Sequence, residues 1–375
     1  MERNEIIKAY GTEFKEMTKR ILAYSDLNGE IVKKLGANAN KGLIAIKPNL
    51  VSVSPADYGA TTHTEIVAGI IEYLGENGYD NLVIVEGSWV GDKTKEAFEY
   101  CGYNALSRQY NVPLIDGQKE KSHKVNCKGM DLNILDCVDD FDFLINVPVL
   151  KGHCQTHITC ALKNMKGLIP NSEKRRFHVM GLHKPIAHLN AGIHQDFIVI
   201  DHICGDPDFE EGGNPLVRNC IMAALDPVLV DAYTENILGY EKGAVEYIRL
   251  AAKLGIGSND LDNLHIVTIE GENNEDLPET HKIMEVNYAV EETDSCSACY
   301  AVLIGALNRL KEEGLLDKLQ EKLGSKICIG QGYRGKSGKC GVGNCTREFE
   351  INVPGCPPSE DEIYYKFKEF VQNSH

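Results

Sequence analysis

The stretch FDFLINVPVLKGHCQTHITCALKNMKGLIPNSEKRRFH, residues 141–178, decides the fold that we expect. Its first part, residues 142–149, is a short apolar run rich in branched side chains, which predicts a buried strand. Directly after this strand come Lys151, His153, Cys154, His157 and Cys160. In an open α/β sheet, groups that follow the carboxyl end of a strand line the crevice where ligands bind. The first expectation is therefore a ligand site at the end of this strand.

Three further strands are predicted to end beside a charged residue. These are LIAIKPNLVS (43–52) with Lys47, NLVIVEGSW (81–89) with Glu86, and FIVIDHICGDPDF (197–209) with Asp201. Helices are expected over 13–35, 63–76 and 94–101, the second with Thr62 as its N-cap, and a loop is expected over 170–178. Strands that alternate with helices predict an α/β fold with mostly parallel sheets and flanking helices.

Length, charge and cysteine content limit the class of protein. A chain of 375 residues favours two domains, and a net charge of −16 argues against a nucleic-acid partner, which would need a basic surface. The first residues lack the basic and apolar regions of a signal peptide, and no apolar run reaches the ~18 residues of a membrane span, so no membrane partner is expected. Thirteen cysteines without an export signal are expected as reduced thiols or metal ligands in the cytoplasm.

The residues after the strand ends are the candidates for a crevice that holds a small anionic substrate or cofactor. We expect catalytic roles for His153, His157, Lys163, Lys47 and Asp201, and ligand-binding roles for Lys151, Asn164, Lys166 and His178. A histidine near its ordinary pKa moves protons at neutral pH, and His178 with His153 or His157 could instead complete a second metal site. Lys163 and Lys166 lie three apart on a helix, so like-charge crowding would lower the pKa of one amine. The alternative is a lysine pair on a solvated helix face.

The last ninety residues carry a separate cysteine pattern. It reads CSAC (296–299), Cys328, CGVGNC (340–345) and PGCPP (354–358), and it follows an acidic, Asn-rich segment at 270–280 that we take as a domain boundary. The predicted domains are thus residues 1–270, with the crevice, and 271–375, a smaller α/β domain. Two thiols at a helix N-terminus with a glycine-rich loop and a Gly-Cys-Pro-Pro turn favour an iron–sulfur cluster over zinc.

This cysteine pattern resembles the proximal-cluster motif in the small subunits of nickel–iron hydrogenases and the related complex I subunit. The resemblance implies a 4Fe-4S cluster with Cys296, Cys299, Cys345 and Cys356 as its ligands. Cys340 is an extra nearby thiol that could replace Cys345, and this alternative stays open.

The larger part, residues 40–260, resembles the domain-of-unknown-function 362 family through IKPNLV, VEGSW, FLINVPVLKGH, ALKNMKGLIP, VIDHI and LDPVLVDAYTENILG. Members of that family often carry iron–sulfur modules. The spacing of His153, Lys163 and His178 is also similar to that of the nickel-pincer lactate racemase family, which implies shared ancestry of the pocket.

Two classes of function follow. One is an iron–sulfur oxidoreductase of an anaerobe, in which the cluster transfers electrons to or from the crevice and an electron-transfer protein docks as a partner. The other is a non-redox isomerase or lyase, or a metal or cluster maturation protein, with a structural cluster. No Gly-x-Gly-x-x-Gly follows a predicted strand, so a nicotinamide site is not supported.

Overall fold

The computed structural model describes residues 1–272 and 282–373, and the chain forms two compact units, one made of most residues up to 272 and one of most residues from 282 on. The expected domain boundary at 270–280 lies mostly outside the described residues. The N-terminal unit is built on an eight-stranded sheet with the order β12-β1-β11-β10-β7-β2-β3-β4. Neighbouring strands pair in parallel except β11, which is antiparallel to both β1 and β10. The strands are β1 (Glu5–Tyr10), β2 (Ile44–Pro48), β3 (Leu82–Glu86), β4 (Leu114–Asp116), β7 (Phe143–Val147), β10 (Phe197–His202), β11 (Cys220–Ala224) and β12 (His265–Glu270).

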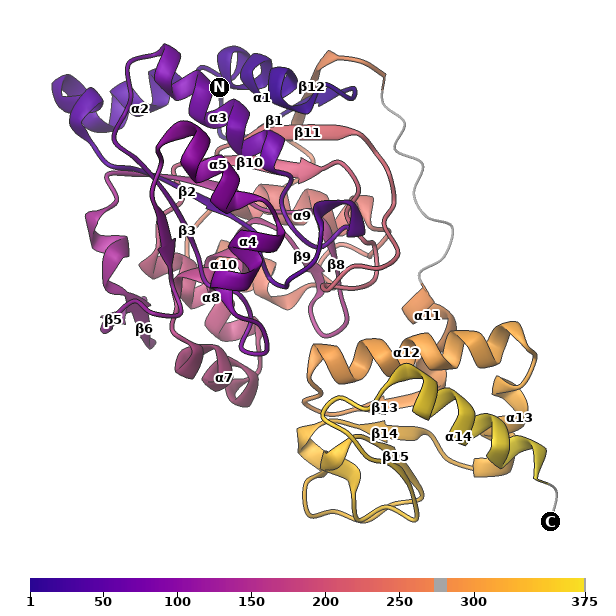
Figure 1. Cartoon of the computed structure of the whole chain (residues 1–375). Coiled ribbons are helices and arrows are strands. Elements are labelled where there is room, and N and C mark those ends of the chain that lie inside the picture. The colour runs from indigo at the N-terminus through magenta and orange to yellow at the C-terminus, as the bar shows by residue number, and fades with distance from the viewer. Residues whose placement is uncertain (273–281, 374–375) are drawn as a thin grey trace. The chain divides into compact units, whose positions relative to one another are not determined.

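Helices cover both faces of this sheet (Figure 1), so its central strands are apolar throughout. Successive residues of β2 point to opposite faces: Ile44 and Ile46 join one buried core, and Ala45 joins the other. The first core packs against α1 (Phe14–Tyr24), α2 (Leu27–Leu35), α3 (Thr64–Glu76), α4 (Thr94–Tyr100) and α5 (Tyr103–Tyr110). The second packs against α6 (Ala161–Asn164), α7 (Asn171–Met180), α8 (His183–Gly192), α9 (Pro227–Ile237) and α10 (Glu246–Lys253).

Two small hairpins leave the main sheet. One pairs β5 (Ser122–Asn126) with β6 (Asp131–Leu135), and the other pairs β8 (Lys151–His153) with β9 (His157–Thr159). The second hairpin follows β7 and leads into α6, so it stands between the end of a central strand and the helix that carries Lys163.

Three local expectations were wrong. The helix over 13–35 is broken, because Asp26 takes a left-handed conformation (φ 54°) and its carboxylate accepts a hydrogen bond from the Gly29 amide to start α2. The loop over 170–178 is mostly helix α7, which Pro170 precedes in an extended conformation. Thr62 is not the N-cap of α3: its hydroxyl donates to the carbonyl of Val147 and accepts from the amide of Asn49, so it ties two strand ends together.

The C-terminal unit contains a parallel sheet with the order β13-β14-β15-β16. Its strands are β13 (Val290–Glu292), β14 (Ile327–Ile329), β15 (Cys340–Val342) and β16 (Ile351–Val353), and its helices are α11 (Lys282–Val286), α12 (Ser297–Glu312), α13 (Leu316–Leu323) and α14 (Glu360–Gln372). The residues outside the expected crevice domain thus form their own small α/β fold.

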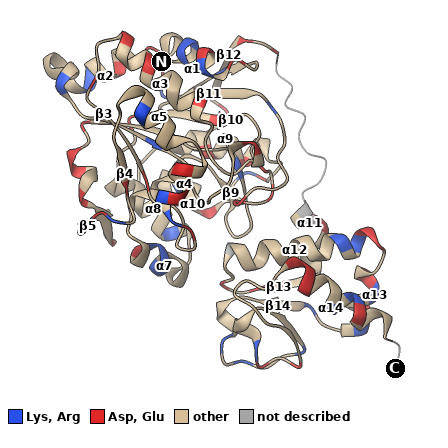
Figure 2. Cartoon of the chain, viewed as in Figure 1, with Lys and Arg blue, Asp and Glu red and all other residues tan. Residues whose placement is uncertain are grey.

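Charged residues lie mainly on the outer helices of both units, while the central strands are largely free of them (Figure 2). None of the helices in the described part of the chain is both long enough and apolar enough to cross a bilayer.

Asp231 of α9 fixes the start of α6. Its buried carboxylate accepts hydrogen bonds from the backbone amides of Ala161 (2.7 Å) and Leu162 (3.2 Å). Burial raises the pKa of Asp231 to about 7, against the stabilising effect of those two amides. A single side chain from a distant part of the sequence therefore positions the short helix that carries Lys163 and Asn164.

We predict that Asp231→Ala destabilises the N-terminal unit by roughly 1–3 kcal/mol, because two buried amides lose their acceptor. Asp231→Asn keeps one side-chain oxygen and should lose less. Differential scanning calorimetry of the full chain measures both variants, and equal melting temperatures for Ala and wild type would show that α6 is held by other contacts.

Candidate functional site

Five lysines from five segments gather at the carboxyl end of the central strands, and we call them the lysine cluster. They lie in β2, in β8 just after β7, in α6, in the 3-10 helix Met165–Leu168 that follows it, and in α7: Lys47, Lys151, Lys163, Lys166 and Lys174. Neighbours in the set repel one another, as Lys151 with Lys163, Lys163 with Lys166, and Lys166 with Lys174. Lys174 and Lys47 repel each other in the same way.

Lys47 is fully buried and pairs with Glu86 from the end of β3. Its Nζ lies 2.7 Å from Glu86 Oε2, 2.7 Å from the carbonyl oxygen of Pro48 and 3.4 Å from Asn164 Oδ1. Burial lowers the pKa of Lys47, and the charge of Glu86 opposes that shift. A Cβ at Gly167 would lie 2.6 Å from the Lys47 amine and 2.0 Å from Glu86 Oε1, so only glycine allows this close approach.

Glu210 joins Lys151 and Lys163. Its carboxylate forms an ion pair with Lys163, whose Nζ also donates to Thr159 Oγ1 at 3.0 Å. The Glu210 carbonyl accepts from Lys151 at 2.9 Å, and Lys151 donates to the carbonyl of Ala60 as well. Burial lowers the pKa of Lys151 to about 8, and Lys163 adds to that shift.

Lys166 and Lys174 carry the least compensated charge. Burial, with repulsion from Lys163, lowers the pKa of Lys166 to about 7. Burial lowers the pKa of Lys174 to about 8, although its amine donates to the carbonyls of Gly87 (2.8 Å) and Ser88 (2.7 Å). Among the described residues, none accepts a hydrogen bond from the half-buried Lys166 amine, which leaves it available to a ligand.

Five amines at this site meet two carboxylates that pair with them, and further acidic groups stand close by: Glu211 and Asp206 act on Lys151, and Asp116 acts on Lys174. Glu86 and Glu210 are the paired carboxylates, and burial next to Glu210 raises the pKa of Glu211 to about 7, so that group is largely uncharged just below neutral pH. Buried like charges without enough counter-charge are costly, and an anion would relieve that cost. The arrangement is therefore suited to a small molecule with a carboxylate or phosphate group.

A buried amide network supports the cluster from the side of α6. Asn164 donates to Asn146 Oδ1 (2.7 Å), and Asn146 donates in turn to Gln195 Oε1 (2.6 Å) and to the carbonyl of Ala161 (3.0 Å). Gln195 then donates to Asn190, which donates to the carbonyl of Leu162. Asn164 thus acts as a bridge between this network and Lys47.

The other expected crevice residues stand on β10, on the β8–β9 hairpin and on α7. Asp201, at the end of β10, accepts from the backbone amide of His63 and lies 2.8 Å from His63 Nδ1. His153 and His157 are on the β8–β9 hairpin, where His153 Nδ1 accepts from the Gln155 amide and the His157 ring packs 4.9 Å from that of Tyr240. His178 occupies the last turn of α7. A shared ligand for His153 and Lys163 stays a prediction.

One lysine of the cluster and the two carboxylates that pair with cluster lysines were not among the predicted site residues. Lys174 lies in the segment expected to be a loop, and Glu210 lies in a stretch without strand or helix periodicity. Glu86 stands at a predicted strand end, which was the signal available for it.

A hollow of about 800 Å³ lies at the other edge of the sheet and includes none of these lysines. Arg3 and Asp226 form an ion pair in this hollow, since Arg3 Nη2 lies 3.3 Å from Asp226 Oδ2, and Asp226 also caps α9. We place the candidate site at the lysine cluster because the unbalanced charge is there.

In the C-terminal unit, four thiols face one another. Cys296 and Cys299, at the start of α12, interact electrostatically with Cys345 and Cys356. Burial raises the pKa of the Cys299 thiol to about 12, and the three other cysteines add to that shift. Cys340 faces Cys328 instead, which identifies Cys345 as the third member of the set.

Polar side chains and a glycine lie beside these four thiols. The Arg334 guanidinium lies against Cys345, which raises the pKa of Arg334, and Gln331 Nε2 donates to Cys296 Sγ at 3.6 Å. Gly343 has φ +90°, a conformation that L side chains rarely adopt, and it lies beside Cys299 Sγ, which would be 3.9 Å from a Cβ at this position.

A family model described as Domain of unknown function (DUF362) matches residues 44–235, a range that includes the whole lysine cluster. A thylakoid-associated protein of Synechocystis sp. is 21% identical over 220 residues, which is 57% of this chain and 68% of that protein. The lactate racemase apoprotein of Thermoanaerobacterium thermosaccharolyticum matches with a TM-score of 0.38 and 12% identity over 62% of this chain, and a Thermotoga maritima protein matches with 0.34 and 15% over 65%. The chain covers 56% and 60% of those two structures.

We predict that the lysine cluster binds sulfate more weakly as pH rises from about 6.5 to about 9. Sulfate keeps its charge over this range, whereas the amines of Lys166, Lys151 and Lys174 lose their protons near pH 7 to 8. Ionisation of Glu211 near pH 7 acts in the same direction. Affinity should fall at least about tenfold by isothermal titration calorimetry. The profile should be flatter in Lys166→Gln and unchanged in Lys95→Gln, which alters an exposed helix residue. A constant wild-type affinity would contradict the assignment.

Proposed function

We propose that this chain, which belongs to the DUF362 family, is an iron–sulfur oxidoreductase that acts on a small anionic molecule. The observation that carries the proposal is the lysine cluster at the carboxyl edge of the sheet, where burial and repulsion from Lys163 and Lys174 act on the half-buried amine of Lys166. The substrate class is a carboxylate or a phosphate ester. The cluster lysines bind its anionic group, because ammonium groups donate charge-assisted hydrogen bonds to carboxylate and phosphate oxygens.

Proton transfer at the site falls to Lys166. Its pKa of about 7 allows the amine both to give and to take a proton near neutral pH, which is the requirement for a general acid–base group. Lys163 and Lys47 are already paired with Glu210 and Glu86, so we assign them to binding and charge balance.

The redox part of the proposal rests on the four thiols of the C-terminal unit. Cys296, Cys299, Cys345 and Cys356 would hold a 4Fe-4S cluster, and when bound that cluster supplies single electrons. Arg334 and the Gln331 amide are positioned to offset negative charge on the sulfurs. An electron-transfer protein as partner belongs to the same proposal. So does a cytoplasmic location, because cysteines are kept as reduced thiols or metal ligands there and this chain has thirteen of them.

The ligand assignment predicts different effects for two neighbouring cysteines. Cys345→Ser should lose the iron and the brown colour of anaerobically purified protein, because an open iron site is labile. Cys340→Ser should keep both, since Cys340 faces Cys328 and not the four thiols. Iron and sulfide analysis with electron paramagnetic resonance after dithionite reduction measures this. Stoichiometric zinc in the wild type, or equal iron loss in both variants, would contradict the cluster assignment.

The redox role predicts that a substrate reoxidises the cluster. Dithionite-reduced protein, freed of excess reductant, should regain its oxidised absorption when a carboxylate or phosphate ester that also carries a reducible carbonyl group is added. Two reduced clusters should be oxidised for each carbonyl, because its reduction to an alcohol takes two electrons and two protons. Lys166→Gln should slow this reaction at least about tenfold and leave the cluster spectrum intact. Some carboxylates or phosphate esters could compete with sulfate for the lysine cluster while none of them reoxidises the iron–sulfur cluster. That result would support the anion site and contradict the oxidoreductase assignment.

A further inference from the structure

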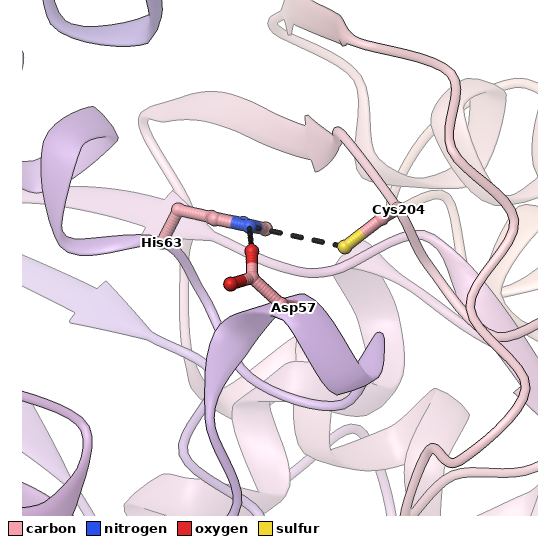
Figure 3. Close-up of side chains that lie close together, drawn as sticks. All are labelled: Asp57, His63 and Cys204. Carbon is pink, nitrogen blue, oxygen red and sulfur yellow. Dashed lines mark hydrogen bonds and ion pairs between the residues drawn. The ribbon is translucent and has the colours of Figure 1, made fainter.

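Three side chains outside the lysine cluster bring an oxygen, a nitrogen and a sulfur ligand together in the N-terminal unit. They are Asp57 from the 3-10 helix Ala56–Tyr58, His63 from the turn before α3, and Cys204 from the segment after β10. Figure 3 shows the His63 ring between the Asp57 carboxylate and the Cys204 sulfur. We propose that these residues bind a divalent late first-row transition metal, with zinc as the reference ion.

The distances fit a single ion. His63 Nε2 lies 3.5 Å from Asp57 Oδ1 and 3.8 Å from Cys204 Sγ, and the three ligand atoms all lie within 4.8 Å of one another. Tetrahedral zinc with bonds of about 2.0–2.3 Å places its ligands about 3.3–3.8 Å apart. The first two separations agree with that geometry, so a small movement of the exposed Asp57 completes it.

Asp201 orients the imidazole for this role. Its Oδ2 lies 2.8 Å from His63 Nδ1 and also accepts from the His63 backbone amide at 2.8 Å. A carboxylate can only accept, so Nδ1 carries a proton, and Nε2 is directed toward Asp57 and Cys204. Burial lowers the pKa of His63, but Asp201 and Cys204 raise it to about 11, so a metal ion has to displace a proton from Nε2. A carboxylate behind a metal-binding histidine is a recurrent feature of zinc sites, because it fixes the ring and makes it a better ligand.

The backbone holds the two ligand segments against each other. A Cβ at Gly59 would lie 2.6 Å from the carbonyl oxygen of Cys204 and 2.6 Å from the amide of Asp206, and Gly59 has φ +81°. The Asp206 amide donates to the Gly59 carbonyl at 3.1 Å. The short approach of residues 56–63 to residues 204–206 thus depends on glycine, and it is built into the fold independently of any ion.

The burial pattern indicates an accessible metal. The side chains of His63 and Asp57 are 7% and 94% exposed, so two donors are fixed inside and the third faces solvent. Three protein ligands with a solvent-facing side leave a position for water or a ligand oxygen. An imidazole, a thiolate and a carboxylate together favour zinc, cobalt, nickel or ferrous iron over magnesium or calcium.

This site uses none of the residues in the proposed anion site or iron–sulfur cluster. It also differs from the second metal site that the sequence suggested at His153, His157 and His178. The proposed metal site and the lysine cluster contact the same loop, because Lys151 donates to the carbonyl of Ala60, between Asp57 and His63. Since the two sites have no residue in common, metal binding at His63 can succeed or fail independently of the proposed oxidoreductase activity.

Cobalt binding tests the proposal in the full chain with Cys296, Cys299, Cys345 and Cys356 replaced by serine, which removes the other thiolate group. One equivalent of Co²⁺ should bind with a thiolate-to-cobalt absorption band, and Zn²⁺ should displace it. Cys204→Ser should abolish the band and weaken binding at least about tenfold. Its hydroxyl can still donate to the Ala56 carbonyl, as the thiol does at 3.4 Å, so folding is retained.

Two more variants complete the test. Asp57→Asn, at an exposed position, should keep the band and lower the affinity for Co²⁺ at least about tenfold. Cys101→Ser is the matched control, since Cys101 donates to the Ser54 carbonyl in the same region, and it should change neither property. The proposal is overturned if the parent protein shows no thiolate band, if Cys204→Ser keeps it, or if Asp57→Asn binds Co²⁺ as tightly as the parent.

Discussion

The burial of lysine amines at one edge of a parallel sheet is the constraint on which this structure depends. Removing an ammonium group from water costs several kcal/mol, and repulsion between neighbouring lysines adds to that cost. Glu86, Glu210 and backbone carbonyls offset part of it, as their contacts with Lys47, Lys163 and Lys174 show. The part of this cost that is not offset lowers the pKa values of Lys151, Lys166 and Lys174. Packing of the apolar sheet must supply the stability that keeps this arrangement folded.

The scaffold around the cluster is correspondingly rigid. Asp231 fixes the start of α6, and the amide network from Asn164 to Gln195 fixes its other side. Gly167 and Gly87 allow the backbone to pass beside Lys47 and Lys174 where any larger residue would collide. Amines held this firmly lose little conformational entropy when an anion arrives, so the fold itself prepares the site for binding.

In the C-terminal unit, burial and repulsion act on thiols instead of amines. Four thiols lie close together, and both burial and their mutual interaction oppose thiolate formation at Cys296 and Cys299. Arg334 relieves this in part. A metal centre would relieve it further, because coordination stabilises the thiolate form. In both units, then, burial and mutual repulsion act together on a group of titratable side chains of one kind.

Sequence patterns predicted β2, β3, β7 and β10, the mostly parallel α/β fold, and the strand ends beside Lys47 and Glu86, with Lys151 just after a strand. They did so because apolar runs, glycines and prolines act within a few residues of each other. Tertiary structure alone decided that Lys174 and Glu210 join the cluster, that Asp201 serves His63, and that Cys345 rather than Cys340 faces Cys296. Those outcomes depend on which distant segments pack together, and local pattern carries no information about such partners. The helix break at Asp26 and the helix over 171–180 were also decided by the tertiary structure. At both places, capping contacts and packing outweighed the secondary-structure preference of the local sequence.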